Sequence, residues 1–383
     1  MNVKDEKIYL LVALAIFIAI GIPYIDLAPS FDGSLYVKCI LKNVSQPFDL
    51  WSFDCFNHPS MLYLFLVSIP QYLSYRNLHL LNGVVLIIGS FSLISFYLLS
   101  KKLLPIKSRE LLAFTLIYAL YPIGWGAFTV FSPDYGCMAI SVIYLSTLVY
   151  QRQIISLLIG TLLVLTKEQG IMAYTIITST YFIFYQLDLS KKQALPRFFS
   201  SLITHWYQFF PAIVIITYYS IKSFSGRSLF WGNHADSSLL TMFLSFDLAS
   251  PVTLTQLTDM FVLNFTWLMS FFIICGLLLV IRQLFITKSL SGNKLLNTTI
   301  GFSFVSVVMM TYMLTRYKTF TNTRYLVIIY PILLLLFAAL LFKFVRTPKV
   351  RIVILSVFVS LNFASLYRTS DPVSKMIFFK NFS

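Results

Sequence analysis

The stretch PSMLYLFLVSIPQYLSY, residues 59–75, decides the membrane topology, that is, on which side of the membrane each later loop lies. It is apolar but short, and it contains Pro59 and Pro70. If it crosses a membrane, every later loop changes side, and the basic cluster at 101–109 lies outside, against the rule that basic residues gather on cytoplasmic loops. We therefore expect an interfacial segment, whose Tyr and Leu side chains dip into lipid while Arg76 stays in water.

The composition around this stretch is that of a membrane protein. Of 383 residues, 58% are hydrophobic and only 11% are charged, whereas soluble domains are about 25% charged. The apolar runs are long and continuous rather than alternating, which favours helices over a barrel. The first run, 8–25, has no small-residue cleavage site after it, so it predicts a retained span. The sequence therefore predicts an all-α polytopic membrane protein.

One transmembrane domain is expected over 1–383, without a separate soluble domain. Two long loops interrupt the apolar runs, at 26–78 and at 224–259. Loops of this length are commonly functional. We expect about eleven spans, at 8–25, 79–100, 110–130, 136–151, 154–166, 171–187, 207–223, 260–281, 297–315, 324–343 and 351–367.

The net charge of +15 is mostly explained by this membrane topology, because most basic residues then lie on the cytoplasmic side. With 59–75 in the interface, the N-terminus is cytoplasmic, and 17 of the 29 Lys and Arg lie inside with four of the 14 acids. No nucleic-acid partner is needed to account for the charge. Since the other acids lie outside, chemistry that needs carboxylates is expected on the extracytoplasmic side. A bacterial inner membrane is the expected location.

The long first loop holds the first candidate site residues. Asp32 opens the pattern Asp-Gly-Ser-Leu-Tyr, and in a helix Tyr36 sits one turn later on the same face. The Asp32 carboxylate could accept a proton from a hydroxyl or hold a metal. Alternatively, Ser30 or Asp32 caps a short helix. His58 could line the same pocket, or it could lie exposed in a turn.

A second acid lies at the extracytoplasmic end of two spans. Ser132 could cap a helix with Pro133 at its first position. Alternatively, Asp134 is a second carboxylate facing Asp32 across one cleft. Acids at the membrane edge are candidate functional groups by default.

The short turn Thr166-Lys167-Glu168-Gln169-Gly170 interrupts two apolar runs. Lys167 and Glu168 could simply pair and solvate a hairpin tip. Otherwise Lys167 could bind a phosphate.

Three cations before the next-to-last span run against the charge rule: Arg316, Lys318 and Arg324. A guanidinium binds phosphate with two parallel hydrogen bonds, which is one use for them. Snorkelling to lipid head groups is the alternative.

The four cysteines match no metal spacing, and no phosphate loop or hydrolase motif is present. Cys39 and Cys55 share the first loop and could pair in an oxidising compartment. Free thiols are the alternative.

Taken in order, these motifs resemble those of GT-C membrane glycosyltransferases, in particular bacterial relatives of protein O-mannosyltransferases and lipid A aminoarabinose transferases. Residues 32–36 resemble the family's Asp-Glu-x-x-Tyr, and 58–63 resemble His/Lys-Pro-Pro-Leu-x-Tyr. The second-loop Asp, the Thr-Lys-Glu-Pro-Gly turn and the Arg-Tyr-Leu…Pro motif correspond to 132–134, 165–170 and 324–331. The resemblance covers residues 26 to about 335, but Gly33, Ser60 and Gln169 depart from the family pattern.

The resemblance implies a GT-C-like bundle that transfers a sugar, with inversion, from a polyprenyl-phosphate donor to an extracytoplasmic protein, lipid or glycan. Asp32 is then the general base, or the carboxylate that orients the acceptor, and Asp134 is the second carboxylate. Arg324, with Lys167 or Arg316, binds the donor phosphate. A divalent metal at Asp32 and Asp134 stays open. The remaining expected substrate-binding residues are Tyr36, His58, Glu168 and Tyr325.

Two other functions remain open. A transporter or flippase for a lipid-linked or anionic substrate predicts polar residues at mid-membrane depth and a pseudo-repeat. A non-catalytic partner in envelope polysaccharide synthesis predicts that Asp32 and Asp134 lie far apart.

Overall fold

The computed structural model describes residues 3–28, 32–45, 62–129, 131–187, 194–224, 257–258, 261, 266–287, 293–317 and 323–366. All regular structure in these ranges is helical. The main helices are α1 (Val3–Gly21), α2 (Asp32–Val44), α3 (Leu62–Ser68), α4 (Leu78–Leu103), α5 (Ser108–Ala119), α6 (Pro122–Thr129), α7 (Pro133–Val149), α8 (Gln153–Val164), α9 (Glu168–Tyr181), α10 (Ala194–Thr204), α11 (Phe210–Phe224), α14 (Thr266–Thr287), α15 (Lys294–Tyr317), α16 (Tyr330–Phe344) and α17 (Pro348–Ser365). Short turns of other helix types are η1 (Ile22–Tyr24), η2 (Ile69–Tyr72), η3 (Phe182–Gln186), η4 (Trp206–Gln208) and η5 (Thr323–Ile329).

Six described helices are long and apolar enough to cross a membrane, or seven if α5 and α6, bent by 42°, form one span. The predicted count of eleven is not confirmed, although each predicted range overlaps a helix. The difference comes from four short helices, since crossing the hydrocarbon core takes about 20 residues. These are α7, α8, α9 and α11, with 17, 12, 14 and 15 residues.

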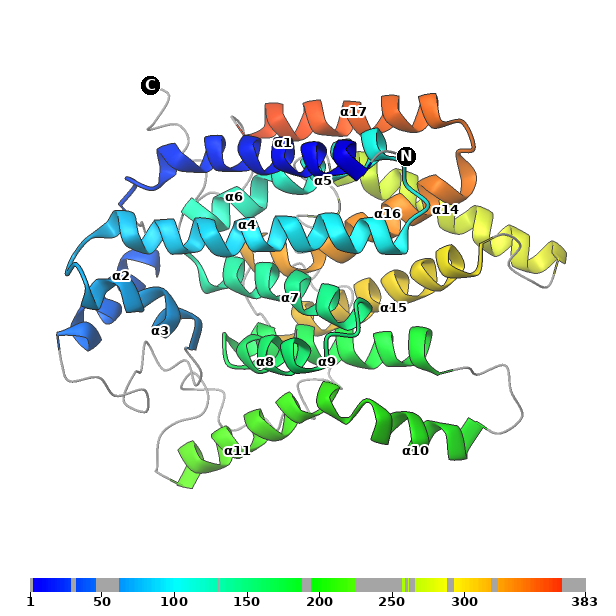
Figure 1. The fold of residues 1–383 in the computed structure, drawn as a ribbon. Helices are drawn as coiled ribbons and strands as arrows, with labels where there is room; N and C mark the ends of the chain where they lie inside the picture. The colour runs from blue at the N-terminus through cyan, green and yellow to red at the C-terminus, as the bar shows by residue number, and fades with distance from the viewer. Residues whose placement is uncertain are drawn as a thin grey trace.

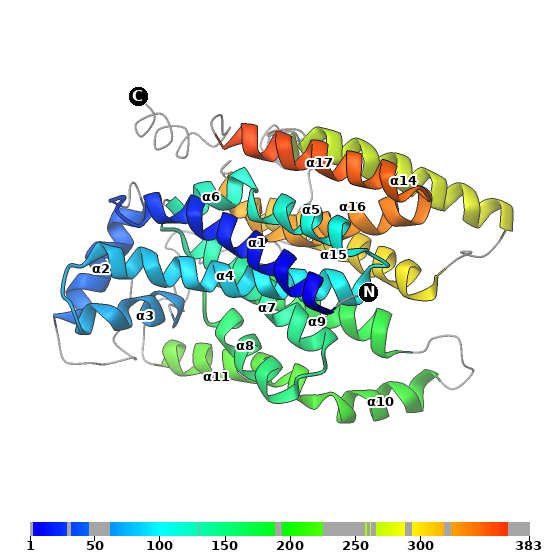
Figure 2. The same cartoon turned by 45° about the horizontal axis from the view of Figure 1, so that its top comes forward.

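Helix α16 forms the centre of the bundle. Of the span Leu326–Phe344, 94% lies buried inside the protein, and α16 packs against α14 and α15 (Figure 2). Its sequence is apolar on all sides, as expected of a helix without a solvent face. The spans of α1, α14 and α17 are only 22–28% buried, so most of their apolar surface faces outward.

The basic loops meet at one end of the bundle, which we call the clamp end. There, the Arg351 Nε lies 2.8 Å from the Glu110 Oε1, and the Lys343 Nζ donates to Asn297 over 2.6 Å. The Tyr150 hydroxyl donates to the Leu98 carbonyl. Three loops therefore share this end, as the charge-based threading predicts: 101–109, 150–152 and 343–351.

At the opposite end, α2 and α3 lie together beside the start of α4 (Figure 1). Helix α3 and η2 cover residues 62–72, which at 1.5 Å per residue is too short to cross a membrane. The prediction that 59–75 does not span therefore agrees with its described part. Its place in the interface stays a prediction. Helix α10, in contrast, was not predicted from the sequence.

Candidate functional site

The entry into α7 positions Asp134. Phe131 is buried and has a left-handed φ of 58°, which turns the chain sharply after α6. Ser132 caps α7 by accepting from the Asp134 amide, and Pro133 occupies the first turn, so the predicted cap is confirmed. The Ser132 hydroxyl also donates to Asp134 Oδ2 over 2.7 Å. The cap therefore orients the carboxylate as well as the helix.

Lys167 meets this carboxylate from the turn between α8 and α9. Its Nζ lies 2.8 Å from Asp134 Oδ1, and the two side chains are only 3% and 1% exposed. A charge removed from water is tolerated when it is paired and hydrogen-bonded. The alternative of a solvated hairpin tip at Lys167 and Glu168 is therefore wrong, since the turn is buried.

Gly170 lets α9 approach α8 closely enough to form this turn. A Cβ at Gly170 would lie 2.1 Å from the Leu163 carbonyl oxygen, a contact with backbone that cannot move aside. Lys167 itself has an extended backbone before α9 begins and makes no side-chain cap. Its ammonium group is directed to Asp134 instead.

Helix α3 docks on this turn and on α7. The Leu62 amide donates to the Leu165 carbonyl over 2.9 Å. The Tyr63 ring lies flat on Gly136, where a Cβ would meet ring atoms at 2.6–2.8 Å. Burial, and then the neighbouring Cys137, raise the pKa of Tyr63, so its phenol stays protonated. In the sequence, Tyr63 ends the motif at 58–63, but no signal there assigns it to the site.

Only some of the candidate site residues in the first loop lie within the described ranges. Asp32 begins α2, so this segment is helical, which is the condition under which Tyr36 lies one turn later; Tyr36 is buried. The Asp32 side chain, His58 and Cys55 lie outside the described residues. Cys39 on α2 is disulfide-bonded, whereas Cys137 and Cys275 are free.

The backbone positions of Arg316 and Arg324, two of the predicted cations, lie at the same end of the bundle as Asp134 and Lys167. Arg316 belongs to the last turn of α15, and Arg324 and Tyr325 to the start of η5. η5 packs against α6 and α7. Their side chains lie outside the described residues, as does Lys318. The described parts of the family-like motifs lie at one end of the bundle by backbone, whereas the Asp32 and Arg324 side chains lie outside the described residues.

Two residues beside Lys167 are also buried, Glu168 and Gln169, 8% and 1% exposed. Glu168 was predicted as a substrate-binding residue. Gln169 was noted only as a departure from the family proline. Both polar atoms of its carboxamide are buried without a hydrogen-bond partner in the part of the chain that the structure describes.

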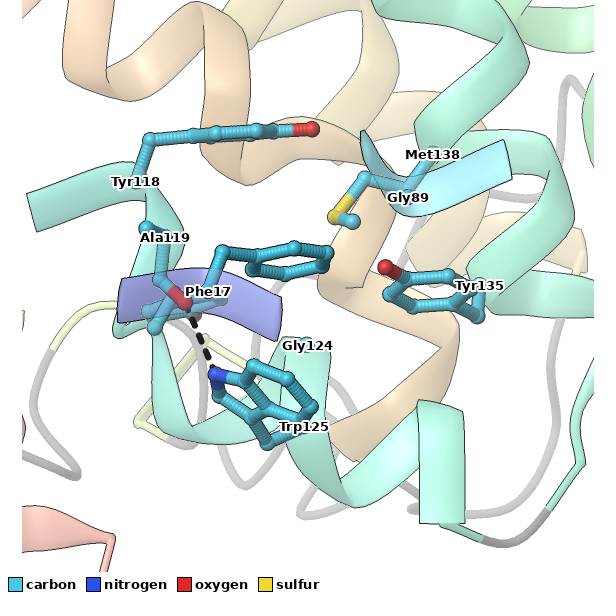
Figure 3. Close-up of a pocket in the computed structure, with 9 residues that line it drawn as sticks. Phe17, Gly89, Tyr118, Ala119, Gly124, Trp125, Tyr135 and Met138 are labelled. Carbon is cyan, nitrogen blue, oxygen red and sulfur yellow. Dashed lines mark hydrogen bonds between the residues drawn. The ribbon is translucent and has the colours of Figure 1, made fainter. Parts of the chain in front are cut away.

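A small aromatic cavity beside Tyr135 is lined by residues of α1, α4, α5, α6 and α7 (Figure 3). It encloses about 20 Å³, which is room for about one water molecule. The Trp125 Nε1 donates to the Ala119 carbonyl over 2.7 Å at its edge. This volume cannot accommodate a lipid chain or a sugar. Further lining residues include Phe17, Tyr118, Tyr121 and Met138.

No group of three His, Cys, Asp or Glu able to hold a metal occurs among the described residues. The metal considered at Asp32 and Asp134 is not tested by this, because the Asp32 side chain is not described. Asp134 already binds Lys167 and Ser132. A metal there has to compete with an ammonium group.

Two solved structures share this fold. The crystal structure of ArnT from Cupriavidus metallidurans in the apo state matches with a TM-score of 0.60 and 11% identity, covering 89% of this chain and 60% of that one. The archaeal oligosaccharyltransferase AglB from Archaeoglobus fulgidus, in complex with an inhibitory peptide and a dolichol-phosphate, matches with a TM-score of 0.55 and 12% identity, covering 96% and 56%. The chain is therefore structurally similar to GT-C glycosyltransferases over most of its length.

The chain spans about three fifths of the length of these two proteins. No protein-family model matches the sequence, and no curated protein matches it. At 11–12% identity the likeness concerns the fold alone.

Proposed function

We propose that this chain is a GT-C-type glycosyltransferase that moves a sugar from a polyprenyl-phosphate donor to an extracytoplasmic acceptor. The observation that carries the proposal is the buried Asp134–Lys167 pair, 2.8 Å apart, where α3, α7 and the α8–α9 turn meet. The residues of this junction are those whose motifs resemble the family. A buried ion pair of this kind is costly to keep, and such groups concentrate at functional sites.

The proposed chemistry needs a base and a cationic site for the leaving group. Asp32, at the start of α2, takes the proton from the acceptor hydroxyl as the sugar is transferred. The leaving group is the lipid phosphate, whose developing charge is stabilised by Lys167 with Arg324 or Arg316. Asp134 holds Lys167 in position as the second carboxylate of the site.

The other predicted residues act as lining in this proposal. Tyr36, His58, Glu168 and Tyr325 contact the donor or acceptor. The dolichol-phosphate in the AglB structure supports a lipid-phosphate donor here, because that protein shares the fold. The site faces the extracytoplasmic side, and a metal at Asp32 and Asp134 is an additional proposal.

The test is Asp32→Asn in the purified, lipid-reconstituted protein, assayed for transfer from a panel of prenyl-phosphate sugars. We expect loss of transfer of about 10²-fold or more, in the range for a general base. The matched control is Asp26→Asn, because Asp26 lies just before α2 but is exposed and pairs with His79. Full transfer activity of a folded Asp32→Asn variant would remove Asp32 from its role. Absence of transfer by the unchanged protein would contradict the proposed function and favour a transporter or a non-catalytic partner.

A further inference from the structure

Gln169 has a feature that the proposed mechanism does not use. It is 1% exposed, and neither its Nε2 nor its Oε1 has a hydrogen-bond partner among the described residues. Buried polar atoms are nearly always hydrogen-bonded, because an unpaired one has lost its hydrogen bonds to water and has gained none within the protein. An unpaired carboxamide in an otherwise packed helix start therefore points to a missing partner.

The helix register shows what Gln169 faces. The Thr180 hydroxyl on α9 bonds the Ser306 hydroxyl on α15, and Tyr185 further along bonds Thr299, so the two segments are antiparallel. Gln169 lies eleven residues before Thr180, which is about three turns, so it is on the same face. The residue eleven after Ser306 is Tyr317. Gln169 is therefore level with the last turn of α15, which carries Arg316.

In the chain, Gln169 follows Lys167, the partner of Asp134, by two residues. It sits in the first turn of α9, whose free amide groups favour an anion. A carboxamide two residues after Lys167, and level with the turn of α15 that includes Arg316, complements a group that carries both anionic oxygens and hydroxyls, since it has donors and an acceptor.

We propose that the Gln169 carboxamide binds the glycosyl-phosphate head group of the donor. Its Nε2 donates to a phosphate oxygen, and its Oε1 accepts from a hydroxyl of the sugar. This inference rests on the proposed function and adds a recognition residue to it. It also gives a reason for glutamine where the resembled family has proline, which can make neither bond.

The experiment compares Gln169→Met with the unchanged protein in detergent micelles, by thermal unfolding and by binding of decaprenyl phosphate and its hexosyl ester. Methionine keeps the size of the side chain and removes both polar atoms. Without lipid, the variant should unfold at a higher temperature. Its affinity for decaprenyl phosphate should fall about tenfold, as expected for one bond to a charged group, and further for the hexosyl ester.

The matched control is Ser303→Ala. Ser303 is fully buried on α15, and its hydroxyl also has no hydrogen-bond partner within the described ranges. This variant should gain thermal stability for the same reason but bind decaprenyl phosphate as the unchanged protein does. Decaprenol, which lacks the phosphate, reports binding of the chain alone.

The outcomes separate the two proposals. If the unchanged protein shows no preference for decaprenyl phosphate over decaprenol, the proposed function fails. If the unchanged protein binds the phosphate and Gln169→Met binds it equally well, the role of Gln169 is overturned while the function stands. Lower stability of Gln169→Met without lipid also overturns it, because the carboxamide then has a partner inside the protein.

Discussion

At the scale of single residues, the buried Lys167–Asp134 pair makes the sharpest prediction. In Lys167→Met the Asp134 carboxylate loses the ammonium group and keeps the hydrogen bond from the Ser132 hydroxyl. Removing one member of a buried ion pair costs about 3–5 kcal/mol. We therefore expect a matching loss of stability in thermal unfolding, together with loss of sugar transfer.

The double variant Lys167→Met with Asp134→Leu distinguishes the two effects. Its stability should recover most of the loss, since apolar side chains of similar size replace buried pairs well. Transfer should stay lost. Recovered transfer in the double variant would show that the pair serves the fold and not the chemistry.

The sequence singled out Asp134 and Lys167 separately but could not pair them. They are 33 residues apart, and whether their side chains meet depends on how α7, α8 and α9 turn back on one another. Local signals did predict the cap at Ser132 and Pro133, because capping involves only neighbouring residues. Gln169 carried no signal of its own, as its unpaired state exists only after packing.

At the scale of helices, the contact between α3 and α7 depends on Gly136. In Gly136→Ala the new Cβ meets the Tyr63 ring, so α3 has to shift away from the α8–α9 turn. Overpacking of this kind costs about 1–3 kcal/mol. We expect a lower unfolding temperature and reduced transfer, with partial recovery when Tyr63→Leu is added.

The control for this variant is Gly83→Ala on α4. A Cβ at Gly83 meets nothing within 4 Å. Alanine in place of glycine stabilises a helix by up to about 1 kcal/mol. Equal destabilisation by both changes would mean that Tyr63 does not rest on Gly136.

The clamp end makes a second prediction at this scale. Arg351 binds Glu110 and the carbonyls of Val345 and Arg346, so it ties α5 to the turn between α16 and α17. Arg351→Leu leaves the fully buried Glu110 carboxylate without this partner, and should cost about 3–5 kcal/mol. Binding of decaprenyl phosphate at low temperature should persist, because the candidate site lies at the opposite end.

At the scale of the whole molecule, the proposed threading is tested by labelling. Ser74→Cys is exposed at the candidate-site end, and Lys102→Cys is exposed at the clamp end. In intact cells a membrane-impermeant thiol reagent should label the first and spare the second until the cells are opened. The reverse pattern would place the site in the cytoplasm and contradict the proposed donor side.

Composition was enough to predict a helical membrane protein, and charge was enough to predict which loops lie at the same end of the bundle. Both predictions depend on the preference of each residue for water or lipid, and this preference can be read from the sequence alone. Hydropathy and charge are sums over residues, and they do not depend on which segments pack together. The length of each helix, the central place of α16 and the burial of the α8–α9 turn were settled only by packing. Packing depends on contacts between segments far apart in the chain, and it is these contacts that unite Lys167 with Asp134 and leave Gln169 unpaired.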